Sequence, residues 1–316
     1  MTLHLRDKWV WDSWSVIDDD GARHLFYLQA NRSLGDPEAR HMNPSIGHAV
    51  STDWRRWTVL PDALAPASGD AWDNATTWTG SIVRGPSGTY HLFYTGSTYS
   101  EDCRIQRIGR ADSTDLIHWE RFGTDPLVEA DGRWYEKYTP TSGWYDEAWR
   151  DPWVFPDPAG NGWHMLITAR ANHGEIYGRG VVGHAFSTDL ENWEVREPLS
   201  APSKFGQMEV TQSLLLDGQP VLVFCCLPRE FNTSRHPIGQ KGGMWVAHGE
   251  SLLGPWDIDG AQRVDHPSLY AARVIEDIDG TARMLGFADR EAGAFRGDIL
   301  DPVDIRLEVN AHRAEA

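Results

Sequence analysis

The sequence predicts an all-β protein, namely a five-bladed β-propeller built from four-stranded blades. Three observations lead to this prediction: a motif that recurs at intervals of 62, 74 and 63 residues, a turn dipeptide that recurs five times, and weak helical periodicity throughout the 316 residues. Self-similarity at such a long period indicates an array of one supersecondary unit. Closing the array into a ring leaves few exposed sheet edges.

The first repeated element reads Gly-x-Ala-x-Ser-Thr-Asp and ends on a tryptophan ten residues after its glycine. The three full copies occupy Gly47–Trp57, Gly109–Trp119 and Gly183–Trp193, and a degenerate fourth copy occupies Trp245–Trp256. We expect each copy to supply a strand followed by a tryptophan-bearing strand. A β-sandwich with accidental internal similarity is the alternative, and the repeated ten-residue spacing disfavours it.

The second repeated element is a turn dipeptide that is followed by an apolar run. Such dipeptides supply the positive φ angles of tight turns between twisted strands, so each copy predicts a hairpin. The five copies are Asp20-Gly21, Ser87-Gly88, Asn161-Gly162, Asp217-Gly218 and Asp279-Gly280. Five hairpins, each leading into the first repeat, make five blades in a single domain that spans residues 1–316.

Composition excludes several classes of protein. A formal charge of −17 argues against binding to nucleic acid or to anionic membranes, which depends on clustered Lys and Arg. The sequence contains no run of eighteen apolar residues and no N-terminal secretion signal, so we expect a cytoplasmic protein. Three cysteines, Cys103, Cys225 and Cys226, are too few for a disulfide framework and are predicted to be buried and reduced.

Equivalent positions in the five blades carry an unusual number of acids. Counting back nine residues from each turn glycine gives Asp12, Thr79, Glu209 and Ala271, and counting back eleven in the longer third turn gives Asp151. Inner strands line the axis of a propeller, so these positions should surround the mouth of one funnel. A carboxylate in an apolar segment is costly unless it is paired or used. A lone acid here would be a strand cap or a local ion pair, but three acids on one axis favour a functional site.

Carboxylates that converge in a tryptophan-lined pocket are typical of glycoside hydrolysis. One acid protonates the departing oxygen, and the other attacks the anomeric carbon or activates water. Burial and like-charge proximity separate the pKa values of the two groups. Tryptophan faces suit the C–H surfaces of sugars.

The motifs that contain these acids resemble those of glycoside hydrolase families 32 and 68, the fructan- and sucrose-acting enzymes, which share a five-bladed propeller. The resemblance covers Trp9 to about Val303, and its most specific part is the Arg-Asp-Pro triplet between an N-terminal Asp and a later Glu. The motifs, in chain order, are Trp11-Asp12-Ser13-Trp14, Trp78-Thr79-Gly80-Ser81, Arg150-Asp151-Pro152 and Glu209.

The resemblance implies a role for each matched residue. Asp12 would be the nucleophile and Glu209 the acid/base of a retaining β-fructofuranosidase or fructosyltransferase. Asp151 would hold sugar hydroxyls and stabilise the transition state, with Arg150 beside it. The residues that would shape the fructosyl subsite are Trp11, Trp78 and Thr79.

Some positions depart from the usual family 32 pattern. Trp-Asp-Ser-Trp replaces the Asn-Asp-Pro signature and is closer to family 68, and Val210 follows Glu209 where Cys or Arg is usual. The chain ends where family 32 would add a β-sandwich, so we expect a propeller without that domain. Two alternatives stay open: an inverting arabinofuranosidase or xylosidase on the same propeller, and a non-catalytic sugar-binding propeller.

No metal ion or cofactor is expected. The segment 178–183 matches the dinucleotide pattern G-x-G-x-x-G, but it leads into a strand rather than a helix. The segment 18–21 lacks the ligand spacing of an EF-hand and fits a solvated turn better. Thirteen histidines are scattered without paired zinc-ligand spacing. The expected partner is therefore a carbohydrate substrate alone, and the sequence leaves the oligomeric state open.

Overall fold

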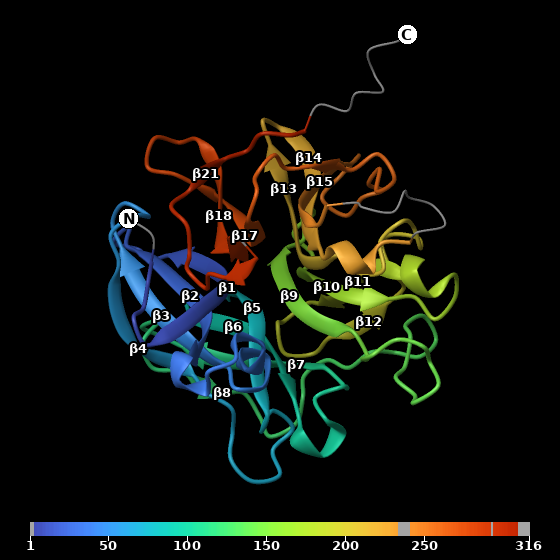
Figure 1. Ribbon diagram of the computed structural model, residues 1–316, viewed down its shortest axis with the longest axis horizontal. Helices are drawn as coiled ribbons and strands as arrows, with labels where there is room; N and C mark the ends of the chain where they lie inside the picture. Colours follow the sequence, from blue (N-terminus) through green and yellow to red (C-terminus); the bar gives the residue numbers. More distant parts are fainter. Residues whose placement is uncertain (1–2, 233–240, 292, 309–316) are drawn as a thin grey trace.

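Five antiparallel sheets stand around one central axis in the computed structural model, which describes residues 3–232, 241–291 and 293–308 (Figure 1). The predicted all-β, five-bladed propeller is confirmed. Blade one is β1 (Lys8–Ile17), β2 (Arg23–Asn31), β3 (Ser45–Ser51) and β4 (Thr58–Leu64). Blade two is β5 (Thr76–Arg84), β6 (Tyr90–Ser97), β7 (Arg107–Ser113) and β8 (Glu120–Arg121). Blade three is β9 (Trp149–Pro156), β10 (Trp163–Arg170), β11 (Gly180–Ser187) and β12 (Glu194–Arg196).

The remaining strands form the last two blades and a small ribbon. Blade four is β13 (Glu209–Leu216), β14 (Gln219–Cys226), β15 (Gly243–His248) and β16 (Gln262–Arg263). Blade five is β17 (Leu269–Glu276), β18 (Ala282–Ala288) and β21 (Val303–Asp304), and β19 (Arg290–Glu291) pairs separately with β20 (Ala294–Phe295). The innermost strands β1, β5, β9, β13 and β17 contact one another around the axis (Figure 1).

The N-terminal segment closes the ring at blade five. Ile299 forms an antiparallel bridge with Phe287 of β18. On its other side, Ile299 exchanges two backbone hydrogen bonds with Leu3. Leu3 thereby occupies the place of a fourth, outermost strand on that blade. Pairing the two ends of the chain in one sheet protects the edge that an open ring would leave exposed.

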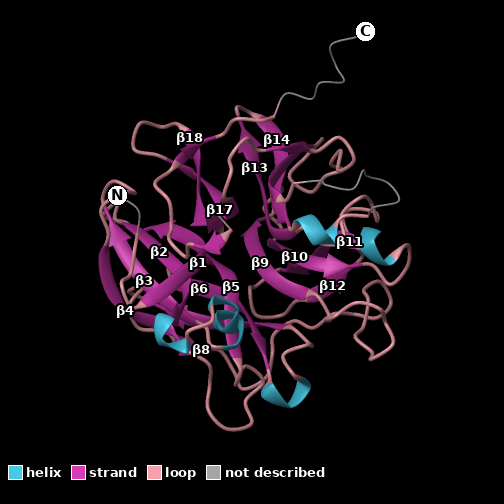
Figure 2. Cartoon of the chain, viewed as in Figure 1, coloured by secondary structure: helices cyan, strands magenta, loops and turns pink. Residues whose placement is uncertain are grey.

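Helices are short and confined to the connections between strands (Figure 2). All of those in the described residues are 3₁₀ turns: η1 (Arg32–Leu34), η2 (Pro37–Met42), η3 (Tyr99–Glu101), η4 (Ile176–Gly178) and η5 (Pro228–Glu230). Within the described part of the chain, no helix has the length and apolar character needed to cross a membrane.

The predicted hairpin turns all occur, but four of them are longer than the two-residue turns that the dipeptides suggest. Only Asp217 and Gly218 form a two-residue turn, with φ of 49° and 76°. In blade one, Asp18 N–H donates to the Ala22 carbonyl and Gly21 N–H donates to the Asp18 carbonyl. There the glycine takes positive φ after an ordinary turn, a three-residue device that the same dipeptide serves equally well. The equivalent loops are Gly85–Thr89 and Asp277–Thr281. The Asp157–Gly162 loop is one residue longer, and Gly160, rather than the predicted Gly162, donates to the Asp157 carbonyl.

The Ser-Thr-Asp repeat forms a corner at the end of the third strand in blades one, two and three. The aspartate side chain accepts hydrogen bonds from backbone N–H groups two and three residues later, at Asp53, Asp115 and Asp189. This corner presents the repeat tryptophan to the preceding blade. Trp119 packs edge-on against Phe26 with ring centroids 5.6 Å apart, and Trp193 packs against Phe93 at 5.5 Å. The ten-residue spacing therefore places Trp119 and Trp193 in contact with the preceding blade.

Buried side chains fill the spaces between neighbouring blades rather than the axis. The three clusters of buried apolar residues are continuous across blade boundaries and include several of the tryptophans. Cys103, Cys225 and Cys226 are buried free thiols, as predicted. Packing between blades leaves the axis itself free to carry polar groups.

Candidate active site

Each innermost strand carries a β-bulge near its start, and these bulges ring one end of the axis. In each blade one extra residue stands opposite the partner strand, so the register shifts just after the last paired residue. The first bulged residues are Asp12, Thr79, Asp151, Val210 and Ala271. Four of the five have positive φ, namely Asp12 (26°), Asp151 (57°), Val210 (53°) and Ala271 (44°). Bulges of this kind re-aim side chains and are frequent beside active sites.

The bulges correct one sequence prediction. Counting back from the turn glycine made Glu209 the equivalent of Asp12 and Asp151, but the equivalent residue is Val210. Glu209 is instead the last paired residue before its bulge, the position held by Trp11, Arg150 and Tyr270 in other blades. The count erred because the turn of blade four has two residues where the turn of blade one has three. The bulge of blade four therefore lies one residue closer to its turn glycine.

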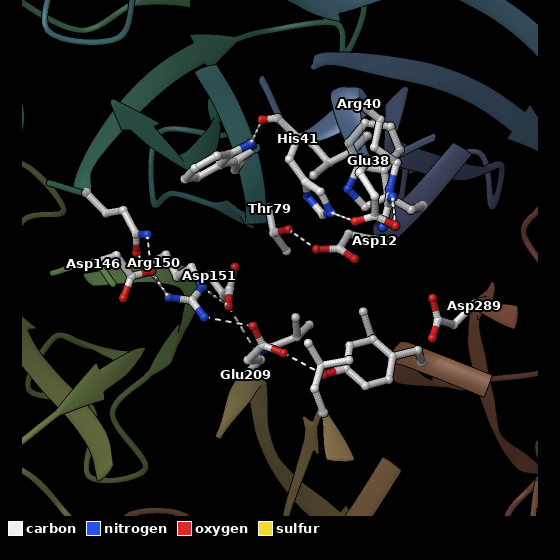
Figure 3. Close-up of a pocket in the computed structure, with 18 of the residues that line it drawn as sticks. Asp12, Glu38, Arg40, His41, Thr79, Asp146, Arg150, Asp151, Glu209 and Asp289 are labelled. Carbon is white, nitrogen blue, oxygen red and sulfur yellow. Dashed lines mark hydrogen bonds and ion pairs between the residues drawn. The ribbon is translucent and has the colours of Figure 1, made fainter. Parts of the chain in front are cut away.

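The bulges open into one cavity of about 540 Å³, within the range of small-ligand sites, about 300–1,000 Å³. Figure 3 shows the side chains of Asp12, Asp151 and Glu209 pointing into this cavity from three different blades. The structure therefore brings together all seven residues singled out from sequence, since the other four also line it: Trp11, Trp78, Thr79 and Arg150.

Asp12 lies on the blade-one side of the cavity. The Thr79 hydroxyl of the neighbouring blade donates a hydrogen bond to its Oδ2. Burial raises the pKa of Asp12 to about 7, and the negative charges of Asp151 and Glu209 add to the effect. The group can therefore exist both with and without its proton near neutral pH.

Asp151 is held more tightly than Asp12. Its Oδ2 accepts hydrogen bonds from the Thr168 hydroxyl at 2.8 Å and from the Val210 N–H at 3.2 Å. Burial raises the pKa of this carboxyl, and the nearby Arg150 opposes that shift. These contacts fix the carboxylate at the floor of the cavity, where it can accept hydroxyl hydrogen bonds.

Arg150 joins the two acids of blades three and four. Its Nη2 lies 2.7 Å from Glu209 Oε1, and its Nε lies 3.6 Å from Asp151 Oδ2. On the other side of Glu209, the Tyr270 hydroxyl donates to Oε2 at 2.5 Å. Glu209 is thus oriented by one donor at each oxygen, a requirement for directed proton transfer. Arg150 lies beside Asp151, as expected, and lines the cavity with only 9% of its surface exposed.

Comparison of the sequence with family models shows the family to which this chain belongs. Residues 3–293 match the family model for the N-terminal domain of glycosyl hydrolases family 32. The chain belongs to glycosyl hydrolase family 32. The resemblance inferred from the sequence motifs is confirmed.

The curated relatives of this family 32 chain are much longer than it is. It is 30% identical over 169 residues to β-fructofuranosidase 1 of Zea mays, covering 52% of this chain and 23% of the maize protein. It is 36% identical over 111 residues to a bifunctional fructosyltransferase of Allium cepa, covering 34% of this chain and 17% of the onion protein. The chain therefore spans about a quarter or less of the length of these relatives.

Solved structures share the propeller of this family 32 chain. Sucrose-6-phosphate hydrolase from Lactobacillus gasseri superposes with a TM-score of 0.75 at 20% identity, covering 96% of this chain and 61% of that one. Levansucrase from Gluconacetobacter diazotrophicus superposes with a TM-score of 0.70 at 18% identity, covering 97% and 80%. At these identities the similarity establishes the fold.

The 3₁₀ turn η2 lines the cavity beside blade one, and its part in the site was not anticipated from the sequence of this family 32 chain. The turn η2 places Arg40 over the Trp11 ring, 5.6 Å from its centroid, and the His41 carbonyl accepts from Trp78 Nε1 at 2.8 Å. The segment holds both predicted subsite tryptophans in place.

Further polar residues of the site also escaped the sequence analysis. Arg150 contacts Gln207, whose amide in turn reaches the Tyr145 hydroxyl, and that hydroxyl donates to Glu230 Oε1 at 2.9 Å. Burial and the charge of Glu209 raise the pKa of Glu230 to about 7. Tyr270 could have been found from the repeat, because it holds the blade-five position that corresponds to Trp11. The others lie in loops without repeat equivalents.

Asp12 should make the stability of the protein depend on pH. Its pKa is 3.8 in the unfolded chain and about 7 in the fold, so its contribution to stability is complete below about pH 4 and is lost as the pH rises through 7. Asp12→Asn removes this titration and tolerates the positive φ. We expect the Asn variant to melt a few degrees above the parent protein at about pH 8, and no higher than it at about pH 4. Calorimetry across this range checks the prediction, and equal melting temperatures at about pH 8 would contradict it.

Proposed function

We propose that this protein is a retaining β-fructofuranosidase that acts on sucrose, fructo-oligosaccharides or fructan through a covalent fructosyl-enzyme intermediate. The observation that supports this proposal most directly is the convergence of Asp12, Asp151 and Glu209 in one cavity of a family 32 propeller. The names of its relatives point the same way, since the maize protein is a β-fructofuranosidase and the onion protein a fructosyltransferase.

In the first step, ionised Asp12 attacks the anomeric carbon while protonated Glu209 gives its proton to the glycosidic oxygen. The carbon–oxygen bond to the leaving sugar breaks as the bond to the Asp12 carboxylate forms. Arg150 and Tyr270, which hold the two oxygens of Glu209, orient that acid toward the bond that breaks.

In the second step, Glu209 acts as a base. Its carboxylate takes a proton from water, the water oxygen attacks the anomeric carbon, and the Asp12 carboxylate departs. Asp151, fixed by Thr168 and the Val210 N–H, accepts hydroxyl hydrogen bonds from the fructosyl ring in both steps. A sugar hydroxyl that enters in place of water gives a transfer product instead of hydrolysis.

A test with sugar substrates establishes the reaction. We would incubate the protein with sucrose, inulin, levan and nitrophenyl furanosides and identify the released sugars. Release of fructose supports the proposal. Release of arabinose or xylose alone would point to the alternative furanosidase function, and binding without turnover would point to a sugar-binding propeller.

The stereochemistry of the first-formed product is a separate prediction. Two successive displacements at the anomeric carbon restore its configuration, so we expect β-fructofuranose first, together with transfer products at high sucrose concentration. Carbon-13 NMR of the anomeric carbon, with sucrose labelled at C2 of its fructosyl unit, follows the anomer directly in the seconds before mutarotation. An initially inverted product would remove Asp12 from the role of nucleophile.

A further inference from the structure

One carboxylate in the wall of the cavity has neither a role in the proposed mechanism nor a partner. Asp289 directly follows β18, the second strand of blade five, and lines the cavity. Figure 3 shows its carboxylate pointing into the cavity from that blade. No residue in the described part of the chain forms a hydrogen bond or an ion pair with this carboxylate, and neither of its oxygens is sealed from solvent. Both oxygens can therefore accept hydrogen bonds from a ligand.

Two arginines that act electrostatically on Asp289 are engaged by another carboxylate. Arg290 Nη2 donates to Glu38 Oε1 at 3.1 Å, and Arg40 Nη1 lies 3.5 Å from the same oxygen. Burial raises the pKa of Asp289, and the charges of these two arginines oppose that shift without an ion pair to its oxygens. Because partly buried acceptors are normally satisfied, we expect a ligand in the cavity to supply the donor that the protein does not.

The pairing of blade five places Asp289 nearer to the mouth of the cavity than the reacting acids. The bulge of this blade, at Ala271, is the equivalent of the bulges at Asp12 and Asp151. The Asp289 N–H donates at 2.9 Å to the carbonyl of Ser268, three residues before that bulge. At about 3.3 Å per residue, Asp289 stands about 10 Å further along the strand direction than the bulge.

That direction leads out of the cavity. Three of the charged lining residues near Asp289 are exposed, namely Glu38, Arg229 and Arg290. Asp12 attacks the anomeric carbon at the inner end, so the fructosyl ring lies among the bulges and the leaving sugar extends toward the mouth. A carboxylate at the level of Asp289 then faces the leaving sugar rather than the fructosyl ring.

We propose that Asp289 is a specificity-determining residue whose carboxylate accepts hydrogen bonds from hydroxyls of the leaving sugar. The preferred substrates are then fructosides with a polyhydroxylated leaving group, such as sucrose, over those with a simple alkyl leaving group. This inference rests on the proposed fructosidase function.

The test compares sucrose with methyl β-fructofuranoside. Both leaving groups are alkoxides that need protonation by Glu209, but methanol carries no further hydroxyl. We expect Asp289→Ala to lower kcat/KM for sucrose by about tenfold to hundredfold, the usual effect of losing a hydrogen bond to a charged acceptor. The same variant should lower kcat/KM for the methyl fructoside less than about threefold. The loss with sucrose should fall mainly on KM, because the contact is made in the ground state as well as in the transition state.

Two further variants separate this role from a structural one. Asp279 is a carboxylate of the same blade that lies in the turn at the opposite end of the β17–β18 hairpin, pairs with Arg283 at 3.0 Å and does not line the cavity. Asp279→Ala should leave the ratio of the two kcat/KM values unchanged. Asp289→Asn keeps the size of the side chain and one acceptor oxygen but loses the charge, so it should lower that ratio by about threefold to tenfold.

The ratio of the two kcat/KM values decides the proposal. An equal loss with both substrates in Asp289→Ala, or an equal change of the ratio in Asp279→Ala, would mean that the substitution acts through the packing of blade five, and would overturn the proposal. If the Ala variant does not fold, an unchanged ratio in Asp289→Asn would overturn it as well. If the parent protein turned over neither fructoside, the proposed function would fail rather than the role of Asp289.

Discussion

Replacing Asp12 by alanine is expected to abolish turnover of every fructoside, with a loss on the order of 10⁵-fold in kcat. The physical reason is that the other two predicted acids are already held by neighbouring groups: Asp151 is held at Oδ2 by Thr168 and Val210, and Glu209 by Arg150 and Tyr270. The loss should be the same for sucrose and for an activated aryl fructoside, since both need the nucleophile. Initial-rate measurements with the two substrates check this.

Rescue of the Asp12→Ala variant by a small anion provides a positive control, because the missing side chain leaves space beside the anomeric carbon. A small anion such as formate or azide can enter it and attack the anomeric carbon of an aryl fructoside in place of the carboxylate. We expect partial recovery of aryl release by the Ala variant, with an inverted azide adduct. Residual activity above about one per cent without added anion would show that Asp12 is not the nucleophile.

Glu209→Ala is expected to lower the activity on sucrose much more than the activity on an aryl fructoside, whereas Asp12→Ala should lower both equally. Loss of a general acid costs about 10²–10⁴-fold when the leaving group needs protonation. The kcat/KM for sucrose should therefore fall by that amount, whereas nitrophenolate departs without help and its release should slow far less. Burst kinetics with the aryl substrate would reveal accumulation of the fructosyl-enzyme, because the second step loses its base.

Glu209→Gln serves as the matched control for this prediction. It keeps the size of the side chain and its contact with Arg150, so it tests the proton rather than the shape. We expect the same division between sucrose and the aryl fructoside. If either Glu209 variant lost activity equally on both substrates, the acid/base role would have to pass to another group, and Glu230 is a candidate because burial raises its pKa to about 7.

The tandem motifs in the sequence are sufficient to predict the propeller, because they encode local geometry. A Ser-Thr-Asp corner caps its own backbone, as Asp115 does for the two residues at 117 and 118, and the tryptophan that follows packs on the preceding blade. Turn glycines adopt positive φ whatever the length of the loop. Such features need only neighbours in the chain, so they are legible without coordinates.

The acids of the site were also predictable, because charged residues inside apolar strands need a reason to be there. Their exact alignment was not. The register of each inner strand depends on a bulge and on the length of its hairpin, so a count from the turn glycine assigned Glu209 to the ring position that Val210 occupies. A β-strand changes faces with each residue, which makes such a count sensitive to an error of one.

The sequence alone therefore determined the five-bladed ring, the family and the three carboxylates Asp12, Asp151 and Glu209. Only the tertiary structure decided which groups surround them: Tyr270 on one oxygen of Glu209, Arg150 on the other, and Asp289 facing the cavity from blade five. These groups come from different blades and loops, separated by up to 139 residues in the chain between Arg150 and Asp289. Their contacts follow from how blades close around an axis, and no local pattern in the chain encodes that closure.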